Sequence, residues 1–277
     1  MKLQFNLEYQ TTFGEELVLN LLSGEKVEQH KMSTLDGLHW SCDLNKTVKN
    51  VSSRGDAAEP GAYVDYYYSL YRGEQQMRHE WLVVPHRLEF AAAKANSYVV
   101  YDHWLDIPED SYMYSSAFTD CVAARKGKMS APSDYTKTVR IKVRAPQLRG
   151  NERLAIIGGG ETLGNWEAKR ALEMVEHENN EWAISLNADA LPQTFEFKFV
   201  ALDEVIDVTP LWENGMNRTI SMPELEQGEV VVYELPQAYF PVYPWKGAGT
   251  VIPIFSLRSE GSFGVGDFGD LKLMIDW

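Results

Sequence analysis

Residues 195–199 read Phe-Glu-Phe-Lys-Phe, three aromatic side chains separated by two charged ones. Apolar and polar residues that alternate with a period of two are typical of a β-strand with one buried face. The same alternation recurs in four further segments, residues 3–9, 40–44, 139–143 and 182–186. Gly, Asn, Asp and Pro clusters separate these segments, and no convincing amphipathic helix pattern precedes Asp267. The sequence therefore predicts an all-β fold built from antiparallel strands.

Net charge and composition limit the classes of partner. The chain has 277 residues, with 26 Lys and Arg against 40 Asp and Glu, and a formal net charge of −14. Nucleic acids and anionic membrane surfaces are bound through basic patches, so this charge argues against both. The N-terminal residues lack the apolar core of a signal peptide, and no stretch approaches the length of a membrane span. We therefore predict a cytoplasmic protein with a neutral partner.

The cysteines and the glycine-rich motifs indicate no metal and no cofactor. Cys42 and Cys121 have neither CxxC spacing nor a histidine cluster nearby, which argues against a disulfide framework and a zinc site. Two reduced and mostly buried thiols are expected. Residues 264–269 read G-x-G-x-x-G, but the eight residues that follow are too few for the βαβ unit of a dinucleotide-binding fold.

Two halves of the chain share a pattern of residue types. Three pairs of segments correspond in order: 40–44 with 182–186, 64–68 with 195–199, and Trp81/Arg87 with Trp212/Arg218. The difference in length between the halves falls in residues 45–61, and surface loops absorb insertions more readily than paired strands do. We predict two immunoglobulin-like antiparallel β-sandwiches in tandem, residues 1–128 and 137–240, joined at residues 126–134.

Trp166 stands in a stretch with the composition of a surface turn, after glycines 158–160 and Gly164-Asn165. Such a tryptophan can fold back onto the core. Lys198 in an apolar strand and Trp212 among polar turn residues suggest a second interpretation, two open indoles with polar neighbours. The C–H face of a pyranose can cover an aromatic ring while its hydroxyls bond to polar anchors. The pattern therefore favours a neutral sugar as ligand.

The motifs around these residues resemble, in order and spacing, the family 20 carbohydrate-binding module, the starch-binding domain. The resemblance covers residues 137–235 and is carried by Leu163-Gly-Asn-Trp166, Trp182, residues 195–199, Trp212-Glu213 and Asn217-Arg218. It implies that Trp166 and Trp212 stack on adjacent glucose units. It also implies that Lys198 and Asn217 hydrogen-bond to sugar hydroxyls, with Glu213 beside them.

Three other tryptophans are secondary or weak candidates. In the resembled family Trp182 is a framework residue or lies near a second site, and the tyrosine usual at that site is replaced here by Gly150-Asn-Glu-Arg. The first half resembles the same module more distantly, without the Leu-Gly-Asn-Trp motif and with Tyr67 at the lysine position. Trp40 and Trp81 would there form a reduced sugar platform, or would pack in the core.

Residues 254–272 resemble the opening of a family 77 glycoside hydrolase barrel, the 4-α-glucanotransferase or amylomaltase family. Residues 251–255 have the pattern of an apolar strand, and residues 269–277 that of a helix after a glycine-rich loop. The resemblance implies that residues 241–277 begin a catalytic (β/α)8 barrel that is truncated here. The two carboxylates that glycoside cleavage requires would lie beyond Trp277, so we assign no catalytic residue.

Together these features predict the non-catalytic N-terminal region of a 4-α-glucanotransferase, which binds an α-glucan such as starch, glycogen or maltooligosaccharides. The catalytic barrel in the same parent chain is the expected partner. Two alternatives remain: a structural spacer or dimerisation region without independent glucan binding, and a glucan-active enzyme fragment. The preferred glucan, glucan binding by the first half, the domain orientation and the oligomeric state are left open by the sequence.

Overall fold

A computed structural model describes most of the chain in seven segments: residues 1–23, 26–45, 62–90, 95–121, 135–203, 210–241 and 250–276. Met1–Pro241 form one compact unit, and Val242–Trp277 belong to a second. Within the larger unit we call residues 1–121 the first half and residues 135–241 the second half. None of the helices in the described segments is long and apolar enough to cross a membrane.

Short β-strands dominate the larger unit. The first half contains β1 (Lys2–Glu8), β2 (Glu15–Ser23), β3 (Lys26–Lys31), β4 (Ser33–Thr34), β5 (His39–Asn45), β6 (Tyr63–Arg72), β7 (Gln75–His79), β8 (His86–Glu89) and β9 (Ser97–His103), followed by η2 (Ser111–Tyr114) and α1 (Ser116–Thr119). The second half contains β10 (Lys137–Arg144), β11 (Glu152–Gly158), β12 (Leu172–Glu173), β13 (Val175–Glu176), β14 (Glu181–Asn187), β15 (Thr194–Asp203), β16 (Leu211–Trp212), β17 (Arg218–Ser221) and β18 (Glu229–Leu235). Four 3-10 segments lie among the latter strands: η3 (Glu161–Trp166), η4 (Ala168–Arg170), η5 (Glu178–Asn180) and η6 (Ala188–Ala190).

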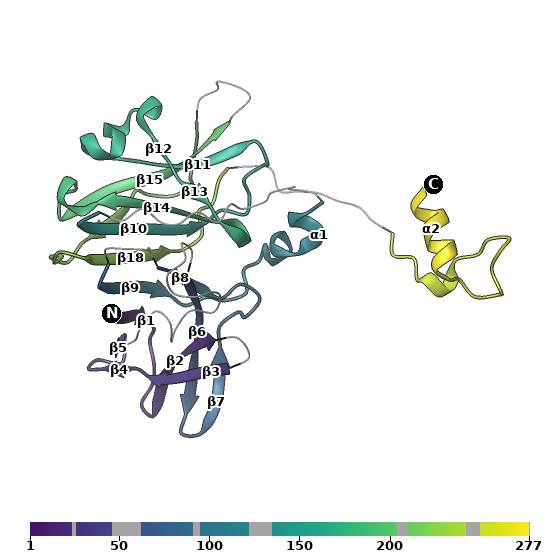
Figure 1. Cartoon of the computed structure of the whole chain (residues 1–277), viewed down its shortest axis with the longest axis horizontal. Helices are drawn as coiled ribbons and strands as arrows, with labels where there is room; N and C mark the ends of the chain where they lie inside the picture. The colour runs from purple at the N-terminus through teal and green to yellow at the C-terminus, as the bar shows by residue number, and fades with distance from the viewer. Residues whose placement is uncertain are drawn as a thin grey trace. The chain divides into compact units, whose positions relative to one another are not determined.

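One eight-stranded sheet runs through both halves, in the order β13-β14-β10-β18-β9-β1-β5-β4 (Figure 1). Each half adds a five-stranded sheet, β2, β3, β6, β7 and β8 in the first and β11, β12, β15, β16 and β17 in the second. The halves meet where β18 and β9 pair in parallel. The two predicted sandwiches thus share one sheet, in which β9 and β18 each supply the backbone partners that the other would lack at a free edge. The expectation of antiparallel strands is corrected at three pairs, β1 with β9, β10 with β18 and β18 with β9, which are parallel. The expected joint at residues 126–134 lies outside the described segments.

The strand order of the two halves is the same. β1 pairs with β5 and β9, as β10 pairs with β14 and β18. β6 pairs with β2, β7 and β8, as β15 pairs with β11, β16 and β17. Each half is thus a two-layer arrangement in which one layer belongs to the shared sheet.

The strand registers show that the expected match between Trp81 and Trp212 is wrong by two residues. When residues 64–68 of β6 are aligned with residues 195–199 of β15, the residue that takes the place of Trp212 in the first half is His79. His86 likewise takes the position that Arg218 has in the second half. Turn lengths vary independently of strand pairing, so equal spacing in the sequence did not mean equivalent positions in the sheets.

The alternation on β15 separates a core face from an outer face, as the sequence predicts. Phe195, Phe197 and Phe199 are 3%, 0% and 0% exposed. Glu196 is exposed and Lys198 half-buried on the opposite face. Burial of each phenylalanine contributes about 1.5–3 kcal/mol, which fixes the strand in this orientation and leaves the Lys198 face for other contacts.

β10 is buried on both faces. Its apolar side chains are fully buried on one face, as expected, but the other face carries three buried cations: Arg140, Lys142 and Arg144. These cations reach the edge of the first half and donate to successive backbone carbonyls, those of Glu89, Arg87 and Pro85 respectively. Buried charges persist only where such partners are present. We call these three cations and their partners the ionic joint.

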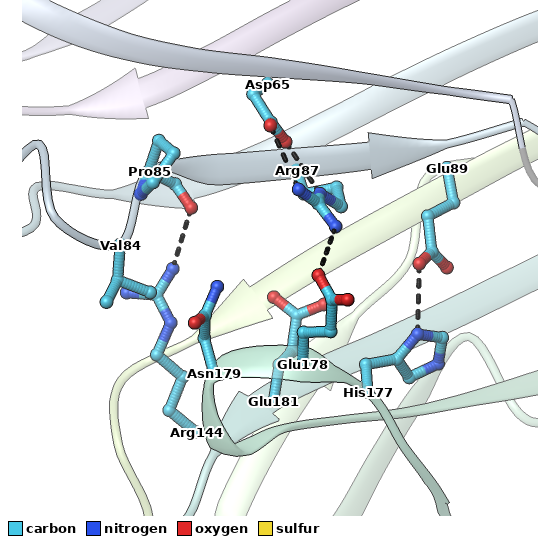
Figure 2. A pocket seen from close by; sticks show the side chains of 10 residues that line it. All are labelled: Asp65, Val84, Pro85, Arg87, Glu89, Arg144, His177, Glu178, Asn179 and Glu181. Atoms are coloured by element: carbon cyan, nitrogen blue, oxygen red, sulfur yellow. Dashed lines mark hydrogen bonds and ion pairs between the residues drawn. The ribbon is translucent and has the colours of Figure 1, made fainter. Parts of the chain in front are cut away.

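Carboxylates complete the ionic joint, and Figure 2 shows one of them, Glu89 beside His177, together with the bond from Arg144 to Pro85. The Nζ atom of Lys142 lies 3.0 Å from Glu181 and 3.7 Å from Glu234, and Arg144 lies 3.2 Å from Glu234. His177 Nδ1 lies 2.9 Å from Glu89 across the same interface. Charged groups from both halves are therefore paired with one another away from water.

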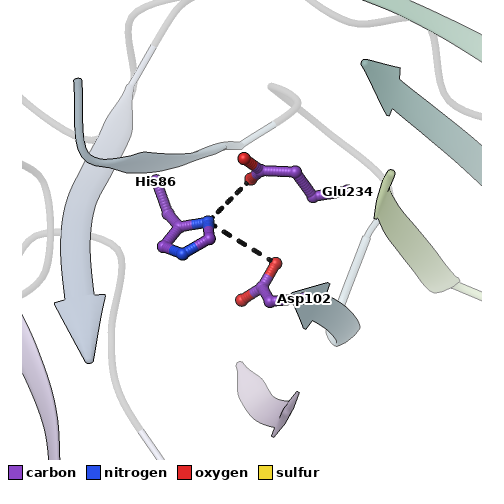
Figure 3. A group of neighbouring side chains, drawn as sticks. All are labelled: His86, Asp102 and Glu234. Atoms are coloured by element: carbon purple, nitrogen blue, oxygen red, sulfur yellow. Dashed lines mark ion pairs between the residues drawn. The ribbon is translucent and has the colours of Figure 1, made fainter. Parts of the chain in front are cut away.

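His86 lies deep in this interface, with a carboxylate at each ring nitrogen. Figure 3 shows the two carboxylates on the Nδ1 side, those of Glu234 and Asp102. Glu80 is 3.0 Å from Nε2 and Glu234 is 3.0 Å from Nδ1, while Asp102 is 4.0 Å from Nδ1. The ligand atoms of His86, Asp102 and Glu234 lie within 4.8 Å of one another, a spacing that a metal ion could bridge. Both ring nitrogens already face carboxylates, however, and two cations of β10 accompany Glu234. The arrangement therefore fits an imidazolium ion.

The stability of the larger unit is expected to depend on the charge of His86. Burial alone would lower its pKa, but the carboxylates of Glu80, Glu234 and Asp102 outweigh burial and hold the pKa well above the ordinary value of 6.5. A base with a raised folded-state pKa stabilises the fold fully below its unfolded pKa, and this contribution is lost as the pH rises through the folded pKa. The difference in unfolding free energy between wild type and His86→Gln should therefore shrink as the pH is raised from about 6 to about 10. Urea unfolding followed by circular dichroism measures the free energy of each protein. A constant difference over that pH range would contradict the charged state of His86.

The smaller unit lacks the strand expected at residues 251–255. Within its described residues, 250–276, there is one 3-10 turn, η7 (Ile254–Ser256), and one helix, α2 (Phe268–Asp276). Pro253 has no N–H to donate, and the described part of this unit offers no second strand as a partner. The helix agrees with the expectation for residues 269–277 to within one residue at each end. The barrel interpretation of residues 241–277 thus remains a resemblance in sequence.

Candidate functional site

Trp166 is held by a turn with an uncommon backbone conformation. Gly164, Asn165 and Trp166 have φ angles of 79°, 53° and 61° at the end of η3. Left-handed backbone is rare for a bulky side chain, and such strained residues cluster at functional sites. A side chain at Gly164 is excluded, because its Cβ would lie 2.5 Å from the carbonyl oxygen of Arg170. The turn therefore fixes the indole of Trp166 in one place at the surface.

Trp166 and Trp212 lie side by side on the outer face of the second five-stranded sheet. Their ring centroids are 6.4 Å apart and their planes are inclined by 28°. Both side chains are half-buried and pack against three buried apolar residues, Ala155, Ile157 and Val200. The pair thus forms a shallow aromatic surface, supported from below by the sheet. We call it the tryptophan platform.

Two polar side chains lie beside the tryptophan platform. Lys198 Nζ donates to the carbonyl oxygens of Glu213 at 3.1 Å and Gly215 at 2.7 Å. An ammonium group has three N–H donors, so these two bonds leave one for a ligand. Asn217 is exposed and donates to Glu196 at 3.3 Å, which leaves its side-chain oxygen as an acceptor. The structure thus brings together four of the five residues expected to contact sugar.

The fifth expected contact, Glu213, has a different role. Only 4% of this residue is exposed. Its carboxylate accepts from the backbone N–H of Phe199 at 2.9 Å and from two nitrogens of Arg218 at 2.9 and 3.0 Å. The expected place of Glu213 among the sugar contacts is therefore corrected, because both carboxylate oxygens are already bonded inside the protein. Glu213 instead positions Lys198, which binds its backbone carbonyl.

The three secondary tryptophans are not part of the tryptophan platform. Trp182 and Trp40 are 1% and 5% exposed, so neither ring offers a face to a sugar. Trp182 therefore has the framework role, and the reduced platform of Trp40 with Trp81 is wrong. Trp81 is half-buried and packs edge-on against Tyr114, with ring centroids 5.3 Å apart.

Two glycines before the turn are part of the site, although the sequence indicated them only as turn residues. A Cβ at Gly158 would collide with the carbonyl oxygen of Glu196, and one at Gly159 would lie 3.6 Å from the indole nitrogen of Trp166. Gly158 therefore lets β11 pass close to β15, whereas a Cβ at Gly159 would only be in ordinary van der Waals contact with the ring. The signal in the sequence is the run of three glycines directly before the Leu-Gly-Asn-Trp motif.

Substitution of Gly164 tests the turn. Gly164→Ala is expected to lower the unfolding free energy by about 2–5 kcal/mol, because left-handed strain of about 1–2 kcal/mol adds to about 1–3 kcal/mol for a collision with the backbone at Arg170. Gly14→Ala is the matched control, since Gly14 has a similar φ of 87° and a Cβ placed there would have no neighbouring atom within 4 Å. It should cost only the strain, about 1–2 kcal/mol. Thermal unfolding measures the loss of stability in both variants. An equal loss of unfolding free energy would show that the contact at Arg170 is unimportant.

Comparison with known proteins gives one family match and several distant similarities. Residues 136–232 match the model of a family described as starch binding domain. The 4-alpha-glucanotransferase DPE2 of Oryza sativa subsp. japonica is 25% identical over 293 residues, covering 99% of this chain and 30% of the rice protein. The chain thus spans 30% of the length of that curated relative.

Among solved structures, two similarities are to parts of amylolytic enzymes. The family 20 carbohydrate-binding module of the maltotetraose-forming amylase from Pseudomonas saccharophila STB07 is 18% identical, with a TM-score of 0.29 over 35% of this chain and 99% of that one. The family 15 glucoamylase from Hypocrea jecorina is 19% identical, with a TM-score of 0.31 over 39% of this chain and 18% of that one.

Proposed function

We propose that residues 136–232, which match the starch binding domain family, hold an α-1,4-glucan on the tryptophan platform. The observation that carries the proposal is the pair of half-buried indoles 6.4 Å apart, because adjacent rings at this spacing can each cover one sugar of a chain. The 28° inclination suits a glucan that curves from one unit to the next. A neutral polysaccharide also agrees with the net charge of −14.

Polar groups beside the rings would fix the orientation of the sugar. The third N–H of Lys198 can donate to a hydroxyl, and the side-chain oxygen of Asn217 can accept from one. A shallow surface buries little of its ligand, so we expect a dissociation constant of about micromolar to millimolar. Such weak sites act by raising the local concentration of a polymer near a tethered enzyme.

Tryptophan fluorescence and affinity electrophoresis test the proposal on the intact chain. Maltoheptaose should change the emission of the wild-type protein, because sugar stacking displaces water from Trp166 and Trp212. The same protein should be retarded in a native gel that contains amylopectin. No spectral change together with no retardation would favour the spacer or dimerisation alternative.

We propose further that the chain is the non-catalytic glucan-binding region of a 4-α-glucanotransferase. The similarity to the rice enzyme over 99% of this chain supports this role. The purified chain should then neither release sugar from maltooligosaccharides nor transfer glucosyl units between them. Measurable turnover would contradict the proposal and favour the enzyme-fragment alternative.

A cytoplasmic location is part of the same proposal. Cys42 and Cys121 are unpaired, which suits a reducing compartment. Cys121 is exposed, so the expectation of two mostly buried thiols holds only for Cys42. Cell fractionation with thiol labelling tests this, and recovery of the protein in a secreted fraction would overturn it.

A further inference from the structure

We propose that a second sugar-binding site lies in the pocket where the two halves meet, and that one glucan chain can occupy both this pocket and the tryptophan platform. The inference rests on the proposed function. We call the site the junction pocket, and five residues that line it carry the argument: Trp81, Tyr114, Arg144, Gln237 and Tyr239.

The junction pocket is built by equivalent segments of the two halves. Residues 104–108 follow β9, and residues 236–239 follow β18. Because β9 and β18 are parallel neighbours, both segments leave the shared sheet at the same edge and face each other there. The pocket is open to solvent and has a volume of about 240 Å³, somewhat below the roughly 300–1,000 Å³ found for small-molecule sites.

The lining of the junction pocket combines aromatic rings with oriented polar groups. Trp81 packs edge-on against Tyr114 from η2, and both are half-buried. Gln237 is fixed between two partners, because it accepts from the Tyr114 hydroxyl at 3.1 Å and donates to Asp110 at 2.7 Å. Aromatic surfaces with a few fixed polar anchors are the combination that recognises a sugar, as on the tryptophan platform.

Arg144 adds a donor whose hydrogen bonding is incomplete. Its side chain is 9% exposed and pairs with Glu234, while its Nε atom is buried without a hydrogen-bond partner in the described part of the chain. A buried donor left without an acceptor costs free energy, and most such groups in proteins find a partner. That Nε atom has less than 1 Å² of exposed surface, so a ligand in the junction pocket does not reach it directly. Arg144 instead contributes a polar wall, which suits a ligand with hydroxyl groups better than a purely apolar one.

One backbone segment, residues 236–239, contacts both the junction pocket and the chain that follows Trp212. Gln237 and Tyr239 line the pocket, and their carbonyl oxygens bind two residues that follow Trp212 in the chain. The N–H of Asn214 donates to Tyr239 at 2.6 Å, and Arg218 donates to Gln237 at 3.3 Å. Tyr239 lines the pocket and is 48% exposed, so it offers an aromatic surface on the segment that the two sites share. A glucan several units long can therefore continue from the platform across Tyr239 into the pocket.

Chain-length dependence of binding tests this inference. Calorimetric titration of the intact chain with maltotriose and with maltoheptaose should show that Trp81→Ala and Tyr239→Ala each weaken maltoheptaose binding about tenfold, or about 1.4 kcal/mol. Maltotriose, which the platform can hold alone, should bind these variants as it binds wild type. Trp212→Ala should weaken the binding of both sugars. Tyr135→Ala is the matched control, since Tyr135 is 43% exposed just before β10, at the opposite end of the shared sheet.

The outcomes separate the inference from the proposed function. Wild-type protein that binds neither sugar would refute the proposed function. Maltoheptaose binding that is no weaker after Trp81→Ala and Tyr239→Ala would overturn the junction site alone. Because Trp81→Ala could disturb folding, a second measurement uses the wild-type protein, in which NMR follows the indole N–H resonance of Trp81. This resonance should shift with maltoheptaose and not with maltotriose. No shift with either sugar would also refute the site.

Discussion

Replacement of Lys142 with methionine is expected to lower the free energy of unfolding by about 3–5 kcal/mol. Methionine keeps much of the apolar stem but removes the ammonium group. Lys142 is 2% exposed, lies 3.0 Å from Glu181 and donates to the carbonyl oxygen of Arg87. Removal of one partner from a buried pair leaves the other charge uncompensated, which costs far more than the net contribution of the intact pair.

Lys137→Met is the matched control for this prediction. Lys137 begins the same strand, but its side chain is 32% exposed, and it pairs with the exposed Asp189 at 3.3 Å. Surface pairs of this kind contribute about 0–1 kcal/mol. Urea unfolding of the intact chain at neutral pH, followed by circular dichroism, compares the two variants. Similar losses for both would mean that the ionic joint is no more important to stability than a solvent-exposed pair.

The ionic joint also shows what alternation in a sequence cannot predict. The period of two on β10 correctly indicates a strand and its apolar face, because side-chain direction depends only on local backbone geometry. Whether the polar face meets water or a second layer depends on distant residues. Arg140, Lys142 and Arg144 have the pattern of a solvated face, yet their partners lie on β8, β14 and β18. The pairing of β9 with β18 is likewise a long-range event without a local signal.

The tryptophan platform was more predictable, because its motif combines local geometry with chemistry. Gly164 and Asn165 indicate a left-handed turn, and a large apolar side chain placed there has few structural uses. The role of Glu213 was not predictable in the same way. A carboxylate next to a tryptophan can face a ligand or pair inward, and the choice here depends on Arg218. Trp81 was misplaced because spacing was compared without knowledge of the turn lengths.

Replacement of Trp212 with alanine is expected to reduce the affinity for maltoheptaose about 30-fold, or about 2 kcal/mol. Trp212 supplies half of the tryptophan platform and lies 6.4 Å from Trp166. It is the better of the two positions for the test, because Trp212 lies in strand β16 whereas Trp166 has a strained backbone with φ of 61°. Substitution at Trp166 would change that strain as well as the stacking surface.

Phe13→Ala is the control for the loss of an aromatic side chain. Phe13 lies in the first half and is fully exposed, so its removal should leave affinity and stability unchanged. Titration of maltoheptaose into each variant gives the affinities, and circular dichroism confirms that each remains folded. Trp212→Phe should recover part of the loss, since a smaller ring still covers some of the sugar face. A folded Trp212→Ala variant that binds maltoheptaose like wild type would show that the glucan is held elsewhere, because the remaining indole of Trp166 covers only one sugar and could not by itself keep the full affinity.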